Sequence, residues 1–494
     1  MAAKSRPNVL FVVLDTARAQ TVLRGLDTGL APTMSRIAAE GTTFTDATTT
    51  APWTLPSHAA MFTGEYTSNH GVNAGNISFA PDTSPLAMQL TEDGYRTAGI
   101  SGNVWISPEF GFDAGFERFS MSWDLFWDAP DLSSVISDRN TTADGQSLLE
   151  IFRGQSARGL VKGAATAGFA KFLAARKDDG AKHATSRTIK WLDRHGTDDQ
   201  PFFYFLNYIE PHLPYEPPGE YIEEYLPDGV SRESLDDLNQ DPWEYIAGDE
   251  SMSDRDFETL KGLYRAEIAY LDSQLERLYE SLADLGILDE TAVVLVGDHG
   301  ENIGEHGLMD HQYCLYETLT HVPLLIRYPE EFAAGETVSG PVEIRDLYPT
   351  VRELAGLPTT DGESVSTNSL LPDDGAPSTR EHAISEYLVP QPALDTLRES
   401  VSSFDPSAER FDRALRAIKT DRWKLIESPN HVELYDLQAD PDERRDLSGD
   451  RQAVSDRLQR TLRDEVGELS RGSADDEKIS EQNRERLENL GYLQ

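Results

Sequence analysis

Short runs of apolar residues alternate along the chain with longer stretches in which apolar residues recur at helical spacing. Val9–Leu14, Phe202–Tyr208 and Ala292–Val296 are almost entirely apolar or aromatic, which is typical of parallel strands buried on both faces. Pro32–Glu40 and Asp256–Leu285 carry apolar residues at helical spacing and are predicted to be helices. This alternation predicts an α/β fold with a mixed, mainly parallel sheet and helices on both faces.

The 494 residues divide at a segment rich in Ser, Thr, Gly, Asp and Pro, residues 359–378, which is predicted to be a linker or loop. Residues 1–358 are predicted to form the catalytic domain, with a helical, basic insert at about 121–195. Residues 379–494 are predicted to form a small C-terminal α+β subdomain, with a short antiparallel sheet and a terminal helix.

The chain is strongly acidic, with 44 Lys and Arg against 86 Asp and Glu. This balance excludes a general nucleic-acid binder, which needs a basic surface, and suggests a halophilic host whose salt screens the self-repulsion. Residues 153–190 depart from the trend, with nine Lys and Arg against two Asp. They form either a solvated face of a helical pair or a lid that contacts an anionic substrate or a membrane surface.

Cysteine content and hydropathy bear on the location of the protein. Cys314 is the single cysteine, so neither an intrachain disulfide nor a cysteine-based zinc cluster is possible. The apolar run near the N-terminus is too short for a signal segment, and no stretch approaches the 18 apolar residues of a transmembrane helix. We therefore expect a cytoplasmic protein without a transmembrane segment.

Two acidic residues stand just past buried strands, Asp15 after Val9–Leu14 and Asp298 after Ala292–Val296. In parallel sheets, ligands bind beyond the carboxyl ends of the strands, so these carboxylates can converge on one site. His299 follows Asp298 in the sequence. Two carboxylates and an imidazole are a plausible set of ligands for one divalent cation.

The segment Trp53–His58 reads WTLPSH and allows two interpretations. Thr is a good helix N-cap and Pro suits the first helical turn, so the segment can be a plain helix start. Alternatively, the Thr54 hydroxyl lies at a helix N-terminus, where positive potential and free N–H groups suit a tetrahedral anion, and acts as a nucleophile.

Several segments, in their order along the chain, resemble the sulfatase family of the alkaline-phosphatase superfamily. They include PNVLFVVLDTAR, APWTLPSHAAMFTGEYTSNHGV, NYIEPHLPYEPP and VVLVGDHGENIGEHG, followed by LYETLTHVPLLIRYP, IRDLYPTVRELAGL and WKLIESPNHVELYDLQADPDERRDL. The resemblance covers nearly the whole chain. It implies the alkaline-phosphatase-like fold and a metal-dependent hydrolase of sulfate or phosphate esters.

The resemblance also implies a metal site and a nucleophile. Asp15, Asp298 and His299 would bind one divalent metal ion, with Thr54 as a further ligand and as the nucleophile. Thr16 stands in the place of a second metal-binding Asp. The resemblance favours Ca²⁺ or Mg²⁺ for a sulfatase, and Mn²⁺ or Zn²⁺ for a phosphotransferase with a threonine nucleophile.

The remaining catalytic roles are implied for three histidines. His58 replaces the arginine that usually follows Pro-Ser, and His212 would contact an ester oxygen or protonate the leaving group. Gln312 stands where the family has a lysine, and we expect the adjacent His311 to take over that role.

Thr54 also departs from the family in its chemistry, because sulfatases oxidise Cys or Ser at this position to formylglycine. A secondary hydroxyl cannot form an aldehyde, so no formylglycine is expected, and an ester on Thr54 must be cleared by water or another acceptor. We therefore expect phosphoryl transfer at least as much as sulfuryl hydrolysis. The alternatives are a phosphodiesterase or phosphoglycerol-type transferase acting on a glycan or lipid head group, and a non-catalytic anion-binding relative, against which the intact residue set argues.

Overall fold

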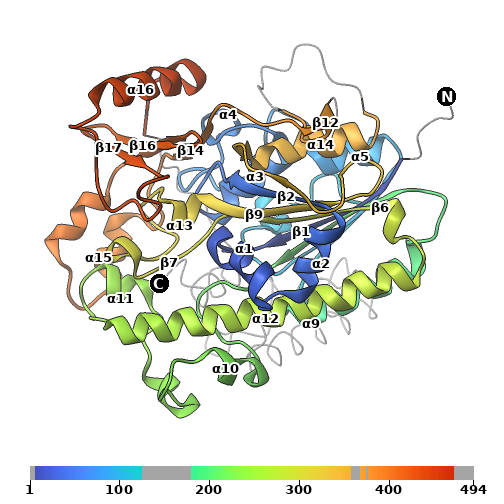
Figure 1. The fold of residues 1–494 in the computed structure, drawn as a ribbon, viewed down its shortest axis with the longest axis horizontal. Helices are drawn as coiled ribbons and strands as arrows, with labels where there is room; N and C mark the ends of the chain where they lie inside the picture. The colour runs from blue at the N-terminus through green and yellow to red at the C-terminus, as the bar shows by residue number, and fades with distance from the viewer. Residues whose placement is uncertain (1–5, 125–179, 358–367, 374–375, 472–494) are drawn as a thin grey trace, which may run out of the picture.

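A nine-stranded sheet forms the centre of the molecule (Figure 1). The computed structural model describes residues 6–124, 180–357, 368–373 and 376–471. The strand order is β10 (Glu336–Val338), β2 (Thr42–Thr48), β9 (His321–Arg327), β6 (Thr291–Gly297), β1 (Asn8–Leu14), β5 (Phe202–Tyr208), β3 (Arg96–Ser101) and β4 (Arg118–Met121), and β11 (Val342–Glu343) also pairs with β2. Of these strands, β9 alone runs antiparallel to its neighbours, so the predicted mixed, mainly parallel sheet is confirmed.

The register of the central strands determines where the site lies. β1 runs parallel to β5 on one side and to β6 on the other, with Leu14 opposite Tyr208 and Gly297. The three strands therefore end at the same edge of the sheet. Asp15 and Asp298, which follow β1 and β6, leave the sheet side by side at this edge.

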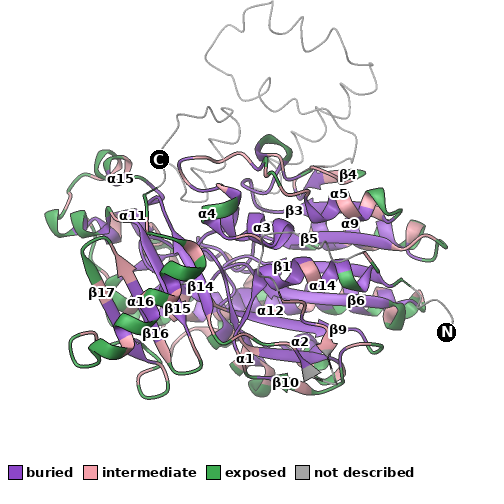
Figure 2. Cartoon of the chain, turned by 90° about the horizontal axis from the view of Figure 1, so that it is seen from above, coloured by how far each residue is buried: buried purple, intermediate pink, exposed green. Residues whose placement is uncertain are grey.

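Helices cover both faces of the sheet (Figure 1). One face packs against α1 (Ala19–Thr28), α2 (Pro32–Glu40), α9 (Ala181–His195) and α12 (Asp254–Asp284), and the other against α3 (Thr54–Thr63), α5 (Leu86–Glu92) and α14 (Leu347–Leu354). Alternate residues of β1 point into these two apolar layers, Phe11 into one and Val12 into the other. The strands are consequently buried almost throughout (Figure 2), as their apolar sequences predict.

Shorter elements connect these layers. The short helices are α4 (Thr67–His70), α10 (Gly219–Tyr225), α11 (Pro242–Ile246), α13 (Glu317–Thr320) and α15 (Leu394–Ser400). Two small hairpins pair β7 (Asn302–Ile303) with β8 (Met309–Asp310) and β12 (Pro372–Asp373) with β13 (Ala376–Pro377). The 3-10 turns are Pro108–Phe110, Arg232–Asp237, Leu288–Glu290, Glu305–Gly307, Ile344–Asp346 and Pro406–Phe411. No described helix is both long enough and apolar enough to cross a bilayer.

The described part of the predicted basic insert forms α9, which belongs to the helix layer of the sheet. Trp191 and Leu192 of α9 are buried against the sheet. Arg187 is 5% exposed and donates hydrogen bonds to the carbonyl of Met121 (3.0 Å) and to Ser120 Oγ (2.9 Å). Arg187 is therefore a buried structural cation. Both interpretations of residues 153–190, a solvated helix face and a lid, would instead leave it exposed. The part of the basic segment 153–190 that precedes residue 180 lies outside the described residues.

The C-terminal sheet is antiparallel in the order β14 (Ala383–Tyr387), β15 (Leu415–Lys419), β16 (Trp423–Ser428) and β17 (His431–Asp436), and α16 (Gln452–Val466) packs on it. Two hydrogen bonds join it to the segment before α3, from the backbone N–H of Glu386 to the carbonyl of Thr50 (2.8 Å) and from Ser385 Oγ to the carbonyl of Thr49 (2.6 Å). The predicted antiparallel subdomain is thus tied directly to the strand–helix connection that carries Thr54.

Candidate active site

Asp15, Asp298 and His299 form one buried group at the carboxyl edge of the sheet. Each offers a ligand atom, and these atoms lie within 4.8 Å of one another. His299 Nε2 is 3.7 Å from Asp15 Oδ1 and 3.5 Å from Asp298 Oδ2. All three side chains are fully buried. The structure therefore brings together the three residues for which the sequence predicts metal binding.

The donor atoms of this group fit a divalent cation. Asp15 Oδ1 and Asp298 Oδ2 are buried oxygens that accept no hydrogen bond from any residue that the structure describes. Burial raises the pKa of Asp298 to about 7, and burial together with the nearby Asp298 charge raises the pKa of Asp15 well above its usual range. Two carboxylates that each destabilise the other's charge are stabilised when a cation lies between them.

The other atoms of the group are held by the backbone. Asp298 Oδ1 accepts from the N–H of Thr16 (3.2 Å) and of His299 (2.8 Å). Thr16 has a left-handed backbone (φ 55°), which is uncommon for a β-branched residue. His299 Nδ1 lies 2.9 Å from the carbonyl of Gly300. Nδ1 therefore carries the proton, and Nε2 presents its lone pair to the acidic side chains.

Thr54 is the first residue of α3, and its side chain faces this group. Trp53, with extended backbone angles, occupies the N-cap position, and no side chain caps the helix. Thr54 Oγ1 instead lies 3.2 Å from His299 Nε2. The interpretation of Thr54 as a plain N-cap is therefore wrong, and its hydroxyl is positioned at the candidate metal site, as the nucleophile hypothesis requires.

Asn103 belongs to the site and was missed by the sequence analysis. Its Nδ2 donates to Asp15 Oδ2 (2.6 Å) and to Thr54 Oγ1 (3.3 Å), and its Oδ1 accepts from the N–H of Trp105 (2.9 Å), which fixes the orientation of the amide. The available signal was its place just beyond the short apolar stretch that forms β3, since polar residues beyond parallel strands share one edge.

His212 and His311 lie in a second buried group beside the first, together with Asp310 and Glu301. The ring of His311 is 4.6 Å from that of His299 and 5.2 Å from that of His212. His311 Nδ1 contacts Asp310 Oδ1 and lies 3.5 Å from Glu301 Oε1. These carboxylates raise the pKa of His311 to about 10 despite its burial, whereas burial and the His311 charge lower the pKa of His212 to about 4.

His311, rather than Gln312, faces the metal group. Gln312 Nε2 donates to Asp310 Oδ2 (2.6 Å), and its side chain is buried in that contact. The exchange of roles between the two residues stays a prediction, and the raised pKa of His311 is compatible with the positive charge that a lysine would carry.

His58 lies behind the nucleophile. Its Nδ1 is 2.9 Å from the carbonyl of Thr54 and 3.5 Å from Asp298 Oδ2, and its ring packs against Phe112 and Phe205. Burial lowers its pKa to about 3, so the ring is neutral. A neutral ring in these contacts can position Thr54 and Asp298. It does not supply the positive charge that the arginine at this position of the family would carry.

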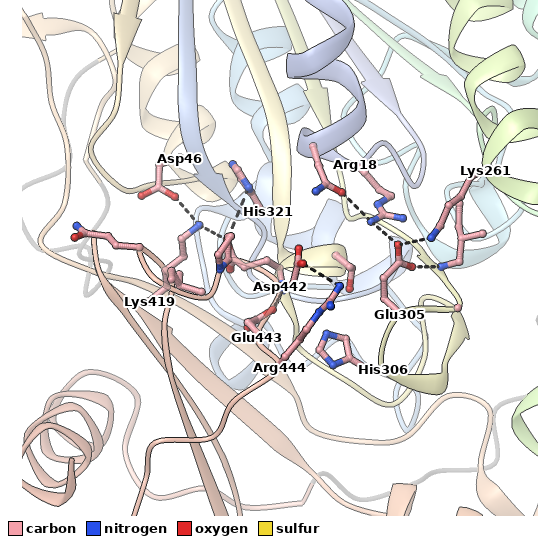
Figure 3. A pocket seen from close by; sticks show the side chains of 18 of the residues that line it. Arg18, Asp46, Lys261, Glu305, His306, His321, Lys419, Asp442, Glu443 and Arg444 are labelled. Carbon is pink, nitrogen blue, oxygen red and sulfur yellow. Dashed lines mark hydrogen bonds and ion pairs between the residues drawn. The ribbon is translucent and has the colours of Figure 1, made fainter. Parts of the chain in front are cut away.

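A cavity of about 1160 Å³ opens between the sheet edge and the C-terminal subdomain. Figure 3 shows Arg18 and Lys261 directed at Glu305, and Lys419 directed at Asp46. Each of these cations is already paired with a carboxylate, and none of the residues described as lining the cavity belongs to the two buried groups.

The comparisons with known proteins agree with this geometry. The family model described as Sulfatase matches residues 7–357, and the model described as N-sulphoglucosamine sulphohydrolase, C-terminal, matches residues 304–471. The uncharacterized sulfatase YidJ of Escherichia coli is 26% identical over 458 residues, which cover 90% of this chain and 84% of that protein. N-acetylglucosamine-6-O-sulfatase of Bacteroides thetaiotaomicron is 25% identical over 515 residues, covering 90% of this chain and 83% of that protein.

Solved structures show the same fold. The phosphonate monoester hydrolase of Agrobacterium radiobacter aligns with a TM-score of 0.66 and 20% identity, over 93% of this chain and 95% of that one. A protein solved with its substrate D-glucosamine-2-N,6-O-disulfate aligns with a TM-score of 0.64 and 21% identity, over 95% of this chain and all of that one. With a family model that spans well over half of its length, the chain belongs to the sulfatase family and is a sulfuric ester hydrolase.

Proposed function

We propose that the protein is a metal-dependent esterase that uses Thr54 as its nucleophile and forms a transient phosphoryl or sulfuryl ester on Thr54 Oγ1. The observation that carries this proposal is the position of Thr54 Oγ1, which lies 3.2 Å from His299 Nε2 and 3.3 Å from Asn103 Nδ2. The buried carboxylates of Asp15 and Asp298 lie beside it, and Asp15 Oδ1 and Asp298 Oδ2 accept no hydrogen bond from the described residues. No other hydroxyl is needed for the reaction, and no formylglycine is required.

Asp15, Asp298, His299 and the Thr54 hydroxyl would hold the cation. When bound, a divalent cation lowers the pKa of a hydroxyl that it contacts and stabilises negative charge on the ester. Asn103 orients Thr54 Oγ1 through the hydrogen bond from Nδ2. The N-terminal N–H groups of α3 face the same position and favour a tetrahedral anion there.

The protein residues then act in two steps. Thr54 first gives up its Oγ1 proton to water. Thr54 Oγ1 then forms a bond to the phosphorus or sulfur atom as the bond to the leaving oxygen breaks, and His311, held at Nδ1 by Asp310 and Glu301, donates the Nε2 proton to that oxygen. In the second step water attacks the Thr54 ester, His311 Nε2 takes up a proton from this water, and Thr54 Oγ1 is released. Neutral His212, beside His311, contacts an ester oxygen.

The chemistry of a threonyl ester favours phosphate over sulfate as the transferred group. A formylglycine hydrate can eliminate its sulfate internally, whereas an ester on Thr54 can be cleared only by attack at the central atom. We therefore propose activity on phosphate esters at least equal to that on sulfate esters. The named activity of N-acetylglucosamine-6-O-sulfatase among its relatives supports a sugar as the alcohol part of the substrate.

The test is a paired turnover assay with Thr54→Ala, Thr54→Ser and the control Thr63→Ala. Thr63 is also a buried threonine of α3, and its Oγ1 donates to the carbonyl of Ala59 (2.7 Å) and accepts from the N–H of Glu65 (3.2 Å), neither of which belongs to the site. Metal-loaded protein is offered 4-nitrophenyl sulfate, 4-nitrophenyl phosphate and bis(4-nitrophenyl) phosphate, and the peptide with residue 54 is analysed by mass spectrometry after rapid acid quenching.

We expect Thr54→Ala to lose turnover, Thr54→Ser to keep part of it, and Thr63→Ala to behave like the wild type. A phosphorylated or sulfated Thr54 peptide identifies the transferred group. Wild-type turnover in Thr54→Ala would show that Thr54 is not the nucleophile. Faster release in the presence of an added sugar or glycerol acceptor would indicate a transferase in place of a hydrolase.

A further inference from the structure

A second, smaller cavity lies between the C-terminal subdomain and the segment that follows β8. Its volume is about 360 Å³, and it shares one lining residue, His306, with the larger cavity of Figure 3. Ligand pockets span roughly 300–1,000 Å³, so a cavity of this size suits a single small ring. We call it the arginine pocket, and the residues of its lining that matter here are Arg410, Arg413, Glu433, His306, Tyr313 and Tyr316.

The charge of the arginine pocket runs against that of the chain, whose formal charge is −42. Two arginines, Arg410 and Arg413, face one carboxylate, Glu433. Arg410 is exposed, and its described contacts are a hydrogen bond from Nη1 to the carbonyl of Ser407 (3.3 Å) and the ring of Phe411, 4.5 Å from its guanidinium. No described carboxylate neutralises Arg410, so the pocket attracts an anion.

The guanidinium of Arg413 also keeps hydrogen-bonding capacity for a ligand. Its Nε donates no hydrogen bond to a described residue, and its Nη2 lies 3.6 Å from Glu433 Oε1, which is longer than a hydrogen bond. The Arg413 side chain is 28% exposed. Glu433 Oε2 accepts instead from Tyr316 OH (3.0 Å) and Tyr435 OH (2.8 Å), so the five N–H groups of Arg413 are not used up within the protein.

Aromatic rings form the walls of the arginine pocket. His306 is exposed and stacks on Tyr316 with ring centroids 3.7 Å apart, and Tyr313 stacks on Phe411 at 5.3 Å. His306 (φ 56°) and Tyr313 (φ 63°) both have left-handed backbones, which persist only where the surrounding structure enforces them and which occur preferentially at functional sites. Flat aromatic faces beside a few polar groups are typical of pockets for small ring-shaped ligands.

The arginine pocket lies against the segment that carries the proposed proton donor. Leu308 and Tyr313 line the pocket, and they flank Asp310 and His311 in the sequence. Arg410 and Arg413 come from the C-terminal subdomain. A ligand in the pocket therefore contacts both the subdomain and the segment of His311.

From this geometry we propose that the arginine pocket binds an acidic sugar unit, a single ring that carries a carboxylate or a sulfate group. The proposal rests on the sugar alcohol of the proposed function. Arg410 and Arg413 hold the oxyanion by charge-assisted hydrogen bonds, and the rings of His306 and Tyr313 contact the face of the sugar. The protein consequently binds acidic glycans more tightly than neutral ones.

The test measures the binding of single sugars that contain no ester, so a negative result leaves the Thr54 proposal untouched. The metal-loaded full chain is titrated calorimetrically with D-glucuronate, with 6-deoxy-6-sulfo-D-glucose, whose C–S bond an esterase does not cleave, and with neutral D-glucose. The variants are Arg410→Met and Arg413→Met, and the matched control is Arg422→Met. Arg422 is also an arginine of the C-terminal subdomain that stacks on an aromatic ring, Trp423 at 4.8 Å, and it does not line the pocket.

We expect one or both acidic sugars to bind, and D-glucose to bind at least about tenfold more weakly. Arg410→Met and Arg413→Met should each weaken the binding of the acidic sugar about tenfold or more, whereas Arg422→Met should match the wild type. The tighter of the two acidic sugars identifies the acidic group as carboxylate or sulfate.

Three results would overturn the proposal: neither acidic sugar binds, D-glucose binds equally well, or the affinity is unchanged in both Arg410→Met and Arg413→Met. Arg410 is exposed, so its variant is expected to fold. If Arg413→Met does not fold, wild-type crystals soaked with 6-deoxy-6-sulfo-D-glucose decide the question, because sugar density only outside the arginine pocket would refute the site.

Discussion

Asn103 offers a sharp test of the site because it touches both the candidate metal group and Thr54, the proposed nucleophile. Its Nδ2 donates to Asp15 Oδ2 at 2.6 Å and to Thr54 Oγ1 at 3.3 Å. Asn103→Ala removes both hydrogen bonds and leaves a fully buried carboxylate oxygen without a donor. Thr54 then rotates more freely, so the loss appears in the catalytic step as well as in cation binding.

The expected magnitude follows from the two contacts. A hydrogen bond to a charged group contributes about 1.5–3 kcal/mol, and a neutral one about 1 kcal/mol. If the variant loses about 3 kcal/mol of transition-state stabilisation, kcat/KM falls roughly 150-fold. Asn103→Asp should fall further, because it places a second carboxylate against Asp15.

The assay measures kcat/KM of metal-saturated protein with the 4-nitrophenyl esters described above. Asn73→Ala is the matched control: Asn73 is also a buried asparagine that bonds to the backbone on both sides, at Gly71 and Gly75, and it contacts none of the site residues. A kcat/KM for Asn103→Ala within about threefold of the wild type, with thermal unfolding unchanged, would refute the positioning role of Asn103.

Three further predictions concern stability. Burial raises the pKa of Asp298 to about 7, so the metal-free fold loses stability as the pH rises from about 4 to 7. The rise in Tm on loading with Mn²⁺ should therefore be larger at pH 8 than at pH 5.5. An equal rise at both pH values would contradict the role of Asp298 as a metal ligand. Lys419→Met leaves the half-buried carboxylate of Asp46 without its cation, whereas Glu317 keeps Lys424. It should cost about 1.5–3 kcal/mol in urea unfolding, against less than about 1 kcal/mol for the exposed control Arg398→Met. If the formal charge of −42 reflects a halophilic host, Tm should rise steadily from about 0.1 to 2 M KCl, and a flat profile would exclude that origin.

The sequence predicted the main elements of the fold because their signals are local. The unbroken apolar run of β1 and the helical spacing of α12 each determine one element, and both occur where expected. The reversed direction of β9 and its place between β2 and β6 could not be read from the chain, because strand pairing is decided by the packing of segments far apart in sequence.

The candidate site was likewise predictable from the sequence only in part. Asp15 and Asp298 follow strands that the sequence identified, so their meeting could be predicted. Asn103 lies just beyond β3 and could have been assigned in the same way. Glu301 and Asp310 could not, because their roles depend on loop paths and on a left-handed backbone at Asp310, which no periodicity in the sequence indicates. The burial of Arg187 likewise depends on how α9 packs.

The bonds from Ser385 and Glu386 to Thr49 and Thr50 have a consequence for synthesis on the ribosome. The segment that carries Thr54 leaves the exit tunnel long before β9, the strand that pairs with β2. It leaves even longer before β14, whose residues bond the carbonyls of Thr49 and Thr50. Until then β2 has an open edge, and such edges promote aggregation during slow, non-local folding. A nascent chain stalled before residue 387 should therefore be inactive and dependent on chaperones, and activity should appear only when nearly the whole polypeptide has emerged.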